Sequence, residues 1–381
     1  MPEGGLLFQI ASAASLAFVV GVVALPLVRR VAVRWELYDR PDAGLKPHAK
    51  PIPYLGGVGI WLGWLVAVLY GMTQSGGQHG LLVWIVVGGA ILMLVGLIDD
   101  LRHLPPGLRL AAQALVAVLL VAGGPGRGIW HALLGPVAAD WTVGSVSLPV
   151  FVSGLFCVLV LAGATNSTNL IDGLDGLCGG IIAIAAVGFA VFAWLMTGRD
   201  GPNAASLWPV LAISGAAFGA SLAFLCFNLP PASMFMGDSG SLLLGFNVAV
   251  LMILMTEGGS WRGLAGALLI FGFPIFDTAL AIARRGLNGR PLLVGDRSHF
   301  YDQLRDRGLT VRQTIAVCYG LGGLFAVLGL ACAVLPAAAI AAVCVSCPLL
   351  AALACRQFGF LRVDDAAERT RRGDGQQRAE P

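Results

Sequence analysis

Long apolar segments recur along almost the whole chain, and this pattern constrains the fold more than any other feature. A helix needs about 20 apolar residues to cross the hydrocarbon core of a bilayer. With 57% hydrophobic and only 12% charged residues, the composition also differs from that of soluble domains, in which about 25% of residues are charged. The sequence therefore predicts an all-α, polytopic membrane bundle of about 11 transmembrane helices. The predicted spans are 6–28, 55–72, 81–98, 108–122, 148–165, 177–196, 206–227, 239–256, 261–283, 313–333 and 335–355.

Basic residues are distributed unevenly between the two sides that alternating spans define. Only Arg127, Arg199 and Arg262 fall on one side, and the other 21 of the 24 Lys and Arg residues fall on or beside the opposite one. The positive-inside rule makes the basic side cytoplasmic, so the N-terminus is expected outside and the C-terminus in the cytoplasm. The expected cytoplasmic loops are 29–54, 99–107, 166–176, 228–238 and 284–312.

Two adjacent acids, Asp99 and Asp100, directly follow the third apolar segment. Carboxylates at the C-terminus of a helix oppose the helix macrodipole, so this placement needs a reason such as a metal ion or a proton to be moved. A solvated helix end is the simpler alternative. Ionisable residues at the edge of a span are candidates for function, and the pair alone leaves both explanations open.

A regular polar run, N-S-T-N-L-I-D-G-L-D-G-L, occupies residues 166–177. Asn166, Asn169, Asp172 and Asp175 recur every three residues, so on a helix or a tight turn we expect the four side chains to share one surface. Such oxygen ligands suit a hard cation, which completes its shell with water and substrate phosphates. A loop without function is the alternative. The regularity of the run beside a membrane favours the cation site.

A third polar segment, N-L-P-P-A-S-M-F-M-G-D-S-G-S, covers residues 228–241. Pro230 and Pro231 end the preceding helix, and Asp238 stands where the next apolar segment begins. The N-terminus of that next helix is expected to offer free N–H groups and a positive dipole to an anion. Asp238 could serve only as an N-cap, but the flanking glycines and serines favour a metal or phosphate site.

The connection 284–312 is rich in arginine and contains the dense segment G-D-R-S-H-F-Y-D at 295–302. Positive-inside charge explains part of this arginine content. Asp277 lies in the ninth apolar segment, about 10 Å before Arg284 at 1.5 Å per residue; it either has a function or pairs with an arginine. Oxygen ligands for Mg²⁺, basic residues for phosphates and an adjoining hydrophobic bundle together fit chemistry on a phosphorylated lipid with a soluble phosphorylated donor.

These motifs, in this order, resemble those of the polyprenyl-phosphate N-acetylhexosamine-1-phosphate transferases, bacterial glycosyltransferase family 4. Members of this family move a sugar-1-phosphate from a UDP-sugar to a membrane polyprenyl phosphate and release UMP. The resemblance extends from Lys50 to about Gly308. It includes K-P-I-P-Y-L-G-G at 50–57, Asp99-Asp100, the N-x-x-N-x-x-D-G-x-D-G-L and F-M-G-D-x-G-S runs, and F-P-I-F-D ending at Asp277.

The resemblance implies a role for each matching residue. Four acids would form the catalytic group: Asp99 as the acceptor-side base with Asp100 beside it, and Asp172 and Asp175 around the phosphates. Asn169 and Asp238 would hold Mg²⁺, with Mn²⁺ as the alternative ion. Either a single displacement or a covalent aspartyl intermediate is compatible with these residues.

Substrate contacts are implied at further positions. Lys50 would contact the donor pyrophosphate, and Asn228 and Phe235 match positions associated with the uridine. The chain departs from the family at its late H-x-H-H element, which reads His299-Phe300-Tyr301-Asp302 here. We expect Arg297 and His299 to hold the phosphates or the sugar of the donor. The lack of three consecutive histidines argues against a phospho-N-acetylmuramoyl-pentapeptide donor and favours the GlcNAc-1-phosphate branch.

Residues 1–355 are accordingly expected to form the transmembrane catalytic domain, and 356–381 a basic, disordered cytoplasmic tail. The implied partners are a UDP-sugar donor, a polyprenyl-phosphate acceptor and membrane lipid, without nucleic acid, in the inner (cytoplasmic) membrane. A homodimer is compatible with the sequence. An ion-coupled secondary transporter is the alternative function, but transporters place their sites near the midplane and are often built from inverted repeats. No internal repeat is evident in this sequence.

Overall fold

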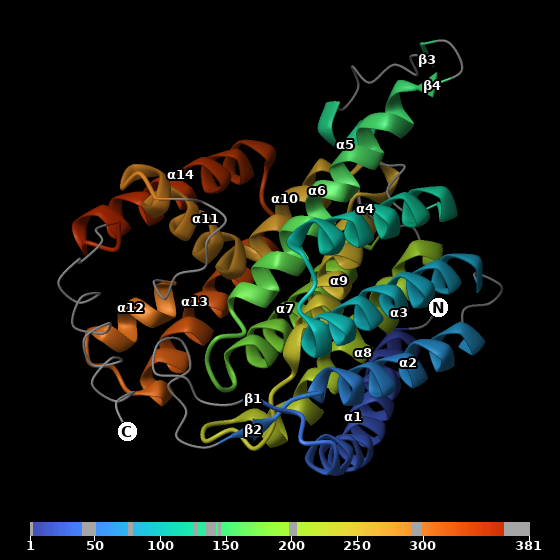
Figure 1. Ribbon diagram of the computed structural model, residues 1–381. Coiled ribbons are helices and arrows are strands. Elements are labelled where there is room, and N and C mark those ends of the chain that lie inside the picture. The colour runs from blue at the N-terminus through green and yellow to red at the C-terminus, as the bar shows by residue number, and fades with distance from the viewer. Residues whose placement is uncertain are drawn as a thin grey trace.

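The computed structural model describes residues 3–39, 51–74, 79–124, 129–134, 142–143, 146–197, 204–290 and 299–361. The predicted helical membrane bundle is confirmed. Ten helices in these ranges are long and apolar enough to cross a membrane, or eleven if a bent pair counts as one span. The chain is thus a multi-pass membrane protein (Figure 1).

The spanning helices follow the predicted order along the chain. They are α1 (Glu3–Arg34), α2 (Gly56–Gln74), α3 (His79–Arg102), α4 (Pro106–Gly123), α6 (Leu148–Leu170), α7 (Leu177–Met196), α8 (Ala204–Asn228), α9 (Gly237–Met255), the pair α10 (Trp261–Ile270) and α11 (Gly272–Leu287), α13 (Val311–Ala331) and α14 (Ala337–Gln357). Short elements connect them: α5 (Ile129–Leu134), α12 (Phe300–Asp306), the 3₁₀ turn η2 (Glu257–Gly259) and two antiparallel pairs, β1 (Tyr38–Asp39) with β2 (Ile52–Pro53) and β3 (Thr142–Val143) with β4 (Val146–Ser147).

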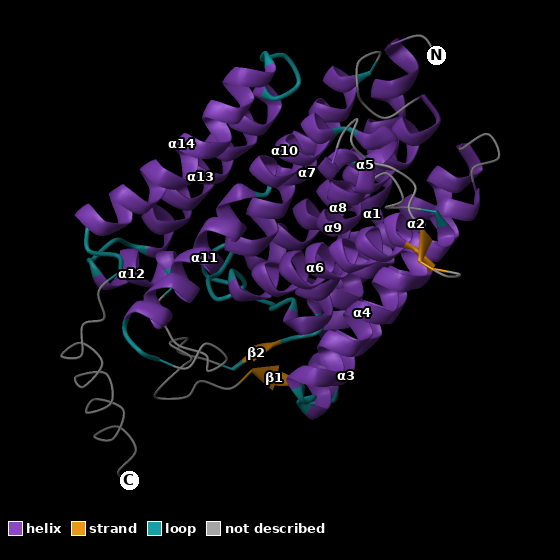
Figure 2. Ribbon diagram, turned by 90° about the horizontal axis from the view of Figure 1, so that it is seen from above, coloured by secondary structure: helices purple, strands orange, loops and turns teal. Residues whose placement is uncertain are grey.

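Helix α9 forms the centre of the bundle. Its apolar window is 94% buried, compared with 28% for α1 and 11% for α14. Helix α9 packs against α2, α3, α6 and α8, which separate it from the lipid. Helix α14 lies at the edge of the bundle in both views (Figures 1 and 2). Its apolar side chains are exposed because lipid takes the place of protein around the rim.

Glycines let the neighbouring helices approach the beginning of α9 closely. A Cβ atom on Gly57 of α2 would overlap the backbone nitrogen of Gly240, and one on Gly96 of α3 would overlap the backbone of Asp238. Small residues serve this purpose in membrane helices, where close backbone packing drives association. The ends of α2 and α3 are therefore held directly against the turn that carries Asp238.

The predicted span 261–283 is bent in the structure. This segment is split into α10 and α11, which meet at 72°. The break falls at Phe271, directly before Gly272 and Pro274. Proline lacks an N–H and is tolerated in the first turn of a helix but not in its interior, so it favours a new helix start at this point.

Several predicted loops are shorter in the structure because the helices continue into them. Helix α1 extends to Arg34, α3 to Arg102 and α6 to Leu170, and α12 lies within the connection 284–312. Most of the predicted tail, from residue 362 onward, lies outside the described residues. Which side of the membrane is cytoplasmic stays a prediction.

Candidate active site

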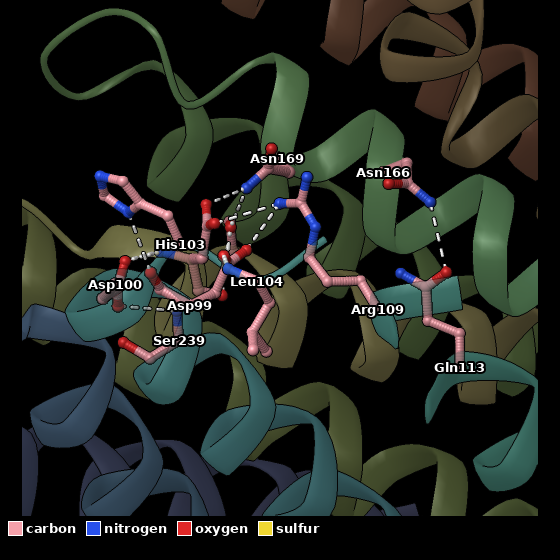
Figure 3. A network of polar contacts seen from close by, with 11 residues as sticks. Asp99, Asp100, His103, Leu104, Arg109, Gln113, Asn166, Asn169 and Ser239 are labelled. Atoms are coloured by element: carbon pink, nitrogen blue, oxygen red, sulfur yellow. Dashed lines mark hydrogen bonds and ion pairs between the residues drawn. The ribbon is translucent and has the colours of Figure 1, made fainter. Parts of the chain in front are cut away.

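Polar side chains from four helices meet at one end of the bundle (Figure 3). Asp99 and Asp100 come from the last turn of α3, Arg109 from the first turn of α4, Asn169 from the last turn of α6, and Asp238 from the first turn of α9. Because successive spans run in opposite directions, these C- and N-terminal ends lie on the same side. Four of the predicted catalytic and metal-binding positions, Asp99, Asp100, Asn169 and Asp238, join one polar network.

Asp100 caps the central helix α9. The backbone N–H of Asp238 donates to its Oδ1 (2.7 Å), and that of Ser239 donates to its Oδ2 (3.1 Å). Gly237 makes room for this carboxylate, since its φ is +71° and a Cβ atom there would lie 2.5 Å from Oδ2. The expected anion at the N-terminus of α9 is thus a side chain of the protein itself. The unfavourable position of Asp100 at the end of α3 is offset by the positive end of α9.

Asp99 faces away from Asp100 and is 5% exposed. Its Oδ1 accepts from the backbone N–H of Leu104 (2.6 Å), and its Oδ2 lies 2.8 Å from Nη1 of Arg109. Arg109 is a cation in the first turn of α4, where the helix dipole is unfavourable for positive charge. Each of these two charges is placed unfavourably with respect to the dipole of its own helix, and the ion pair between Asp99 and Arg109 offsets this cost.

Asp238 connects three of the helices. Its Oδ2 accepts from Nη1 of Arg109 (3.2 Å), and its Oδ1 accepts from the amide nitrogen of Asn169 (2.6 Å), which also donates to Oγ of Ser241 (2.9 Å). In this arrangement the amide nitrogen of Asn169, and not its oxygen, faces Asp238. An ion shared by the two side chains would therefore require the amide to rotate, because only the oxygen can bind a metal.

The polar run 166–177 does not present its four side chains on one surface. Asn166 donates to the backbone oxygen of Ala162 (2.7 Å) and faces Gln113 of α4, away from the acids (Figure 3). Helix α6 continues to Leu170, and the chain then turns over 171–176. The expected convergence fails already within α6, because three residues turn a helix by about 300°, so the side chains of Asn166 and Asn169 point about 60° apart.

Asp175 and Asn228 join this turn to the loop 229–236. The carboxylate of Asp175 accepts from the backbone N–H of Ala232 (2.9 Å). Asn228 is 3% exposed; its oxygen accepts from Gly176 N–H (2.8 Å) and its nitrogen donates to the carbonyl of Met234 (3.0 Å). Both side chains hold backbone in this structure. Further along the loop, Phe235 is bound through its backbone to Pro53 and Gly56, at the start of α2.

Asp172 lies partly buried in the same turn, beside the acid cluster. Its pKa is raised well above the usual range, first because the carboxyl is shielded from water and then because Asp238, Asp100 and Asp175 repel a further negative charge. The rise shows that acids from three elements share one electrostatic environment. A cation placed among them would be attracted by all of them.

The altered histidine element is anchored to two places. His299 Nδ1 lies 2.7 Å from Oδ2 of Asp277, a fully buried carboxylate whose Oδ1 accepts from Phe300 N–H (2.7 Å).

The hydroxyl of Tyr301 donates to the carbonyl of Leu170 (3.0 Å), where the turn 171–176 begins. Gly173 provides the space, because a Cβ atom there would overlap this hydroxyl. Tyr301 thus couples α12 to the turn that carries Asp172. Lys50 and Arg297 lie outside the described residues.

The donor set suits a cation that brings its own ligands. Within the described ranges, no group of three or more His, Cys, Asp or Glu side chains forms a ready metal cage. Mg²⁺ is typically bound through one or two carboxylates plus substrate phosphates and water. The cluster of Asp238 and Asp172 with the amide of Asn169 fits such an ion better than one that needs a full protein shell.

Comparisons with known proteins agree with this arrangement. Residues 82–256, which span α3 to α9 and contain Asp99, Asp100, Asp172 and Asp238, match the model of glycosyl transferase family 4. A probable undecaprenyl-phosphate N-acetylglucosaminyl 1-phosphate transferase of Bacillus subtilis is 32% identical over 318 residues, covering 82% of this chain and 83% of the relative. The chain belongs to glycosyl transferase family 4.

Other relatives match over similar lengths. A decaprenyl-phosphate N-acetylglucosaminephosphotransferase of Mycolicibacterium smegmatis is 30% identical, covering 81% of this chain and 79% of its own. An undecaprenyl-phosphate alpha-N-acetylglucosaminyl 1-phosphate transferase of Salmonella typhi is 28% identical, with coverages of 79% and 77%. The resemblance inferred from the sequence motifs is confirmed, down to the GlcNAc-1-phosphate branch of the family in these relatives' names.

Sequence reasoning missed Arg109, which was counted only as a basic residue at the edge of a span. One signal was present: a cation in the first turn of a predicted helix opposes the dipole, as Asp99 does at the end of the preceding one. Opposite charges that each oppose the dipole of their own helix, at the facing ends of consecutive helices, predict an ion pair between them. The contact of Tyr301 with Leu170 had no comparable signal, because it joins segments 131 residues apart.

Proposed function

We propose that this protein transfers N-acetylglucosamine-1-phosphate from UDP-N-acetylglucosamine to undecaprenyl phosphate, with release of UMP. The observation that carries the proposal is the acid cluster of Asp99, Asp100, Asp172 and Asp238, which lies at one end of the bundle and within the region that matches family 4. The names of the relatives support a polyprenyl-phosphate acceptor and an N-acetylglucosamine-phosphate donor.

The electrostatics of the site support a requirement for a divalent cation. Among the described residues, Asp99 and Asp238 share a single arginine. Asp172 lies close enough to Asp238 and Asp100 to be affected by their charge. A pyrophosphate would be repelled by this cluster. Mg²⁺ bound at Asp238 and Asp172, with Asn169 beside them, would neutralise the donor phosphates and stabilise the leaving UMP. Mn²⁺ has similar ligand preferences and is the expected substitute.

The protein's own residues supply orientation. Asp100 fixes the backbone at Asp238 and Ser239 through their N–H groups, and Asn169 fixes one oxygen of the Asp238 carboxylate. Asp99 is held by Leu104 and Arg109 at the edge of the bundle, where it would accept a proton from the acceptor phosphate. Because phosphoryl transfer depends chiefly on positioning and charge neutralisation, rigid placement of these groups would provide much of the catalysis.

Location and partners follow from the spans. We place the protein in the inner membrane with its acid cluster facing the cytoplasm, where nucleotide sugars are made, in agreement with the distribution of its basic residues. The donor then arrives from solution and the lipid from the membrane, and no nucleic acid takes part. The transporter alternative is not favoured, since the acids gather at helix ends rather than near the middle of the spans.

A donor competition assay tests the sugar. Purified protein in detergent would be given undecaprenyl phosphate, Mg²⁺ and equimolar amounts of UDP-GlcNAc with a ¹³C-labelled sugar, unlabelled UDP-GalNAc and UDP-MurNAc-pentapeptide. The label gives the two otherwise isobaric N-acetylhexosamine products different masses, and the lipid products would be separated by mass. We expect the N-acetylhexosamine product to form from UDP-GlcNAc and the pentapeptide donor to remain unused. The Asp238→Asn variant, which keeps shape and removes charge, serves as the inactive control. Preferential use of another donor would refute the assignment of the sugar.

A further inference from the structure

Asp238 has no unoccupied carboxylate oxygen in this structure. Asn169 donates to Oδ1 at 2.6 Å, and Arg109 donates to Oδ2 at 3.2 Å. A metal ion that binds Asp238 would compete with these partners, because each carboxylate oxygen that it could bind already accepts a hydrogen bond. Asn169 is also bound to Ser241 at 2.9 Å, on the same helix as Asp238. Arg109 comes from a different helix and makes the longer of the two bonds, so it is the partner that can be exchanged.

Arg109 uses only a small part of its bonding capacity. Its Nη1 atom contacts both Asp99 Oδ2 (2.8 Å) and Asp238 Oδ2 (3.2 Å). Among the described residues, Nε and Nη2 have no hydrogen-bonding or ionic partner, although a guanidinium carries five N–H donors. The side chain is 27% exposed, compared with 30% for Asp238 and 6% for Asp99. The guanidinium can thus leave Asp238 and remain on the more deeply buried Asp99.

The negative charge of the neighbouring carboxylates requires a positive group beside them even when no metal ion is bound. Asp99, Asp100 and Asp238 approach one another through α3 and α9, and partial burial makes their mutual repulsion stronger than it would be in water. Arg109 is the one positive group in contact with two of them within the described part of the chain. It has the position and sign that a bound divalent cation would also have.

We propose that Arg109 is an internal counter-ion that competes with the divalent cation for Asp238. In the empty site it neutralises Asp99 and Asp238 together. When the metal binds, Arg109 gives up Oδ2 of Asp238 and retains Asp99, which keeps that carboxylate in place. This inference rests on the proposed function, because it assumes that Asp238 is a metal ligand. It assigns Arg109 a positioning role and predicts that it weakens metal binding in the absence of substrate.

Direct binding of Mn²⁺ to the unliganded, full-length protein tests this competition. Free Mn²⁺ would be titrated by electron paramagnetic resonance for the wild type, Arg109→Gln and Arg109→Lys. Loss of one neighbouring positive charge should tighten binding in Arg109→Gln by on the order of tenfold. Arg109→Lys keeps the charge and should stay within about threefold of the wild type, since an ammonium can also contact two carboxylates. A packing role would affect both variants alike.

Two controls separate the possible failures. Arg102→Gln removes an exposed arginine seven positions earlier and should leave Mn²⁺ binding unchanged, which excludes a general effect of net charge. Asp238→Asn should abolish the binding.

If Arg109→Gln melts like the wild type and binds Mn²⁺ with equal or lower affinity, the competition does not occur and Asp238 can still be the metal ligand. If the wild type binds Mn²⁺ and Asp238→Asn binds it equally well, the metal site itself is wrong and the inference fails with it. If no variant binds Mn²⁺, either with or without UDP, the metal site is also wrong and the inference fails.

Discussion

The carboxylate of Asp100 lies 2.7 Å from the backbone nitrogen of Asp238, and so the end of α3 caps the beginning of α9. The family resemblance implies a catalytic role for Asp100 and a metal-binding role for Asp238. The bond between them, however, joins the side chain of Asp100 to the backbone of Asp238. Asp100 therefore acts on the site by fixing where Asp238 stands. Its neighbour Asp99 points to Arg109 instead. Two adjacent acids in the last turn of α3 thus perform different tasks.

Asp100→Asn should separate these tasks. An amide offers one acceptor oxygen in place of two and lacks the charge that stabilises the α9 N-terminus, so we expect a loss of about 1 kcal/mol of stability. Turnover should fall together with the melting temperature. Asp99→Asn should lower turnover without loosening the start of α9, and its effect on the melting temperature should come from the weakened ion pair with Arg109. Thermal unfolding and UMP release would be measured on both variants in detergent. Equal melting temperatures for Asp100→Asn and the wild type would contradict the capping role.

Tyr301→Phe should loosen the connection between α12 and the turn 171–176. Removing the hydroxyl leaves the carbonyl of Leu170 without this bond, at a cost of roughly 1 kcal/mol. Since that turn carries Asp172, we expect turnover to fall several-fold while the KM for the lipid stays constant. Tyr38→Phe, on the β1 strand, is a matched control that should have little effect. The role would be disproved by hydrogen exchange in the turn that is identical in Tyr301→Phe and the wild type.

Metal binding should release a proton from Asp172. The raised pKa means that folding increases proton binding at this group, so it lowers stability as pH rises from its ordinary pKa towards the raised one. A bound cation favours the carboxylate, and metal affinity should therefore increase with pH across the same interval. Calorimetric titration of Mn²⁺ in buffers of different ionisation enthalpy counts the protons released. We expect a smaller count in Asp172→Asn, and an unchanged count would exclude Asp172 as the source.

Single-cysteine labelling tests the orientation. Leu287 at the end of α11 is 72% exposed and lies on the predicted cytoplasmic side, whereas Leu134 of α5 is 45% exposed and lies on the opposite side. The natural Cys226 and Cys344 are exposed, so a cysteine-free background is required. In intact cells an impermeant maleimide should label Leu134→Cys and spare Leu287→Cys. The reverse pattern would invert the topology and move the acid cluster to the outer face.

The spans and the main site could be predicted because they depend on local sequence. Apolar length predicts the helices, and the motifs predict functional roles for Asp99, Asn169 and Asp238. Gly272 and Pro274 could also have predicted the bend at Phe271. The length of an apolar segment alone does not show whether it forms one helix or two short ones.

The functions of Asp100 and Asn228 could not be read in the same way. Asp100 caps a helix that begins 137 residues later, and Asn228 holds the backbone of Gly176 on another segment. Such bonds are set by tertiary packing, which here depends on glycines such as Gly57 and Gly96 that allow the helices to approach. Polar residue type and spacing indicate that a side chain has a partner, and only the fold determines which partner it is.

The nucleotide released in a complete reaction tests the central claim most directly. Purified protein would be incubated with UDP-GlcNAc, undecaprenyl phosphate and Mg²⁺, and both the nucleotide and the lipid would be identified by mass spectrometry. We predict UMP and undecaprenyl-diphosphate-GlcNAc in equal amounts, with neither formed when the lipid or Mg²⁺ is omitted or when Asp238 is changed to Asn. Release of UDP with a monophosphate-linked sugar, or no lipid product at all, would contradict the proposed transfer of a sugar-1-phosphate.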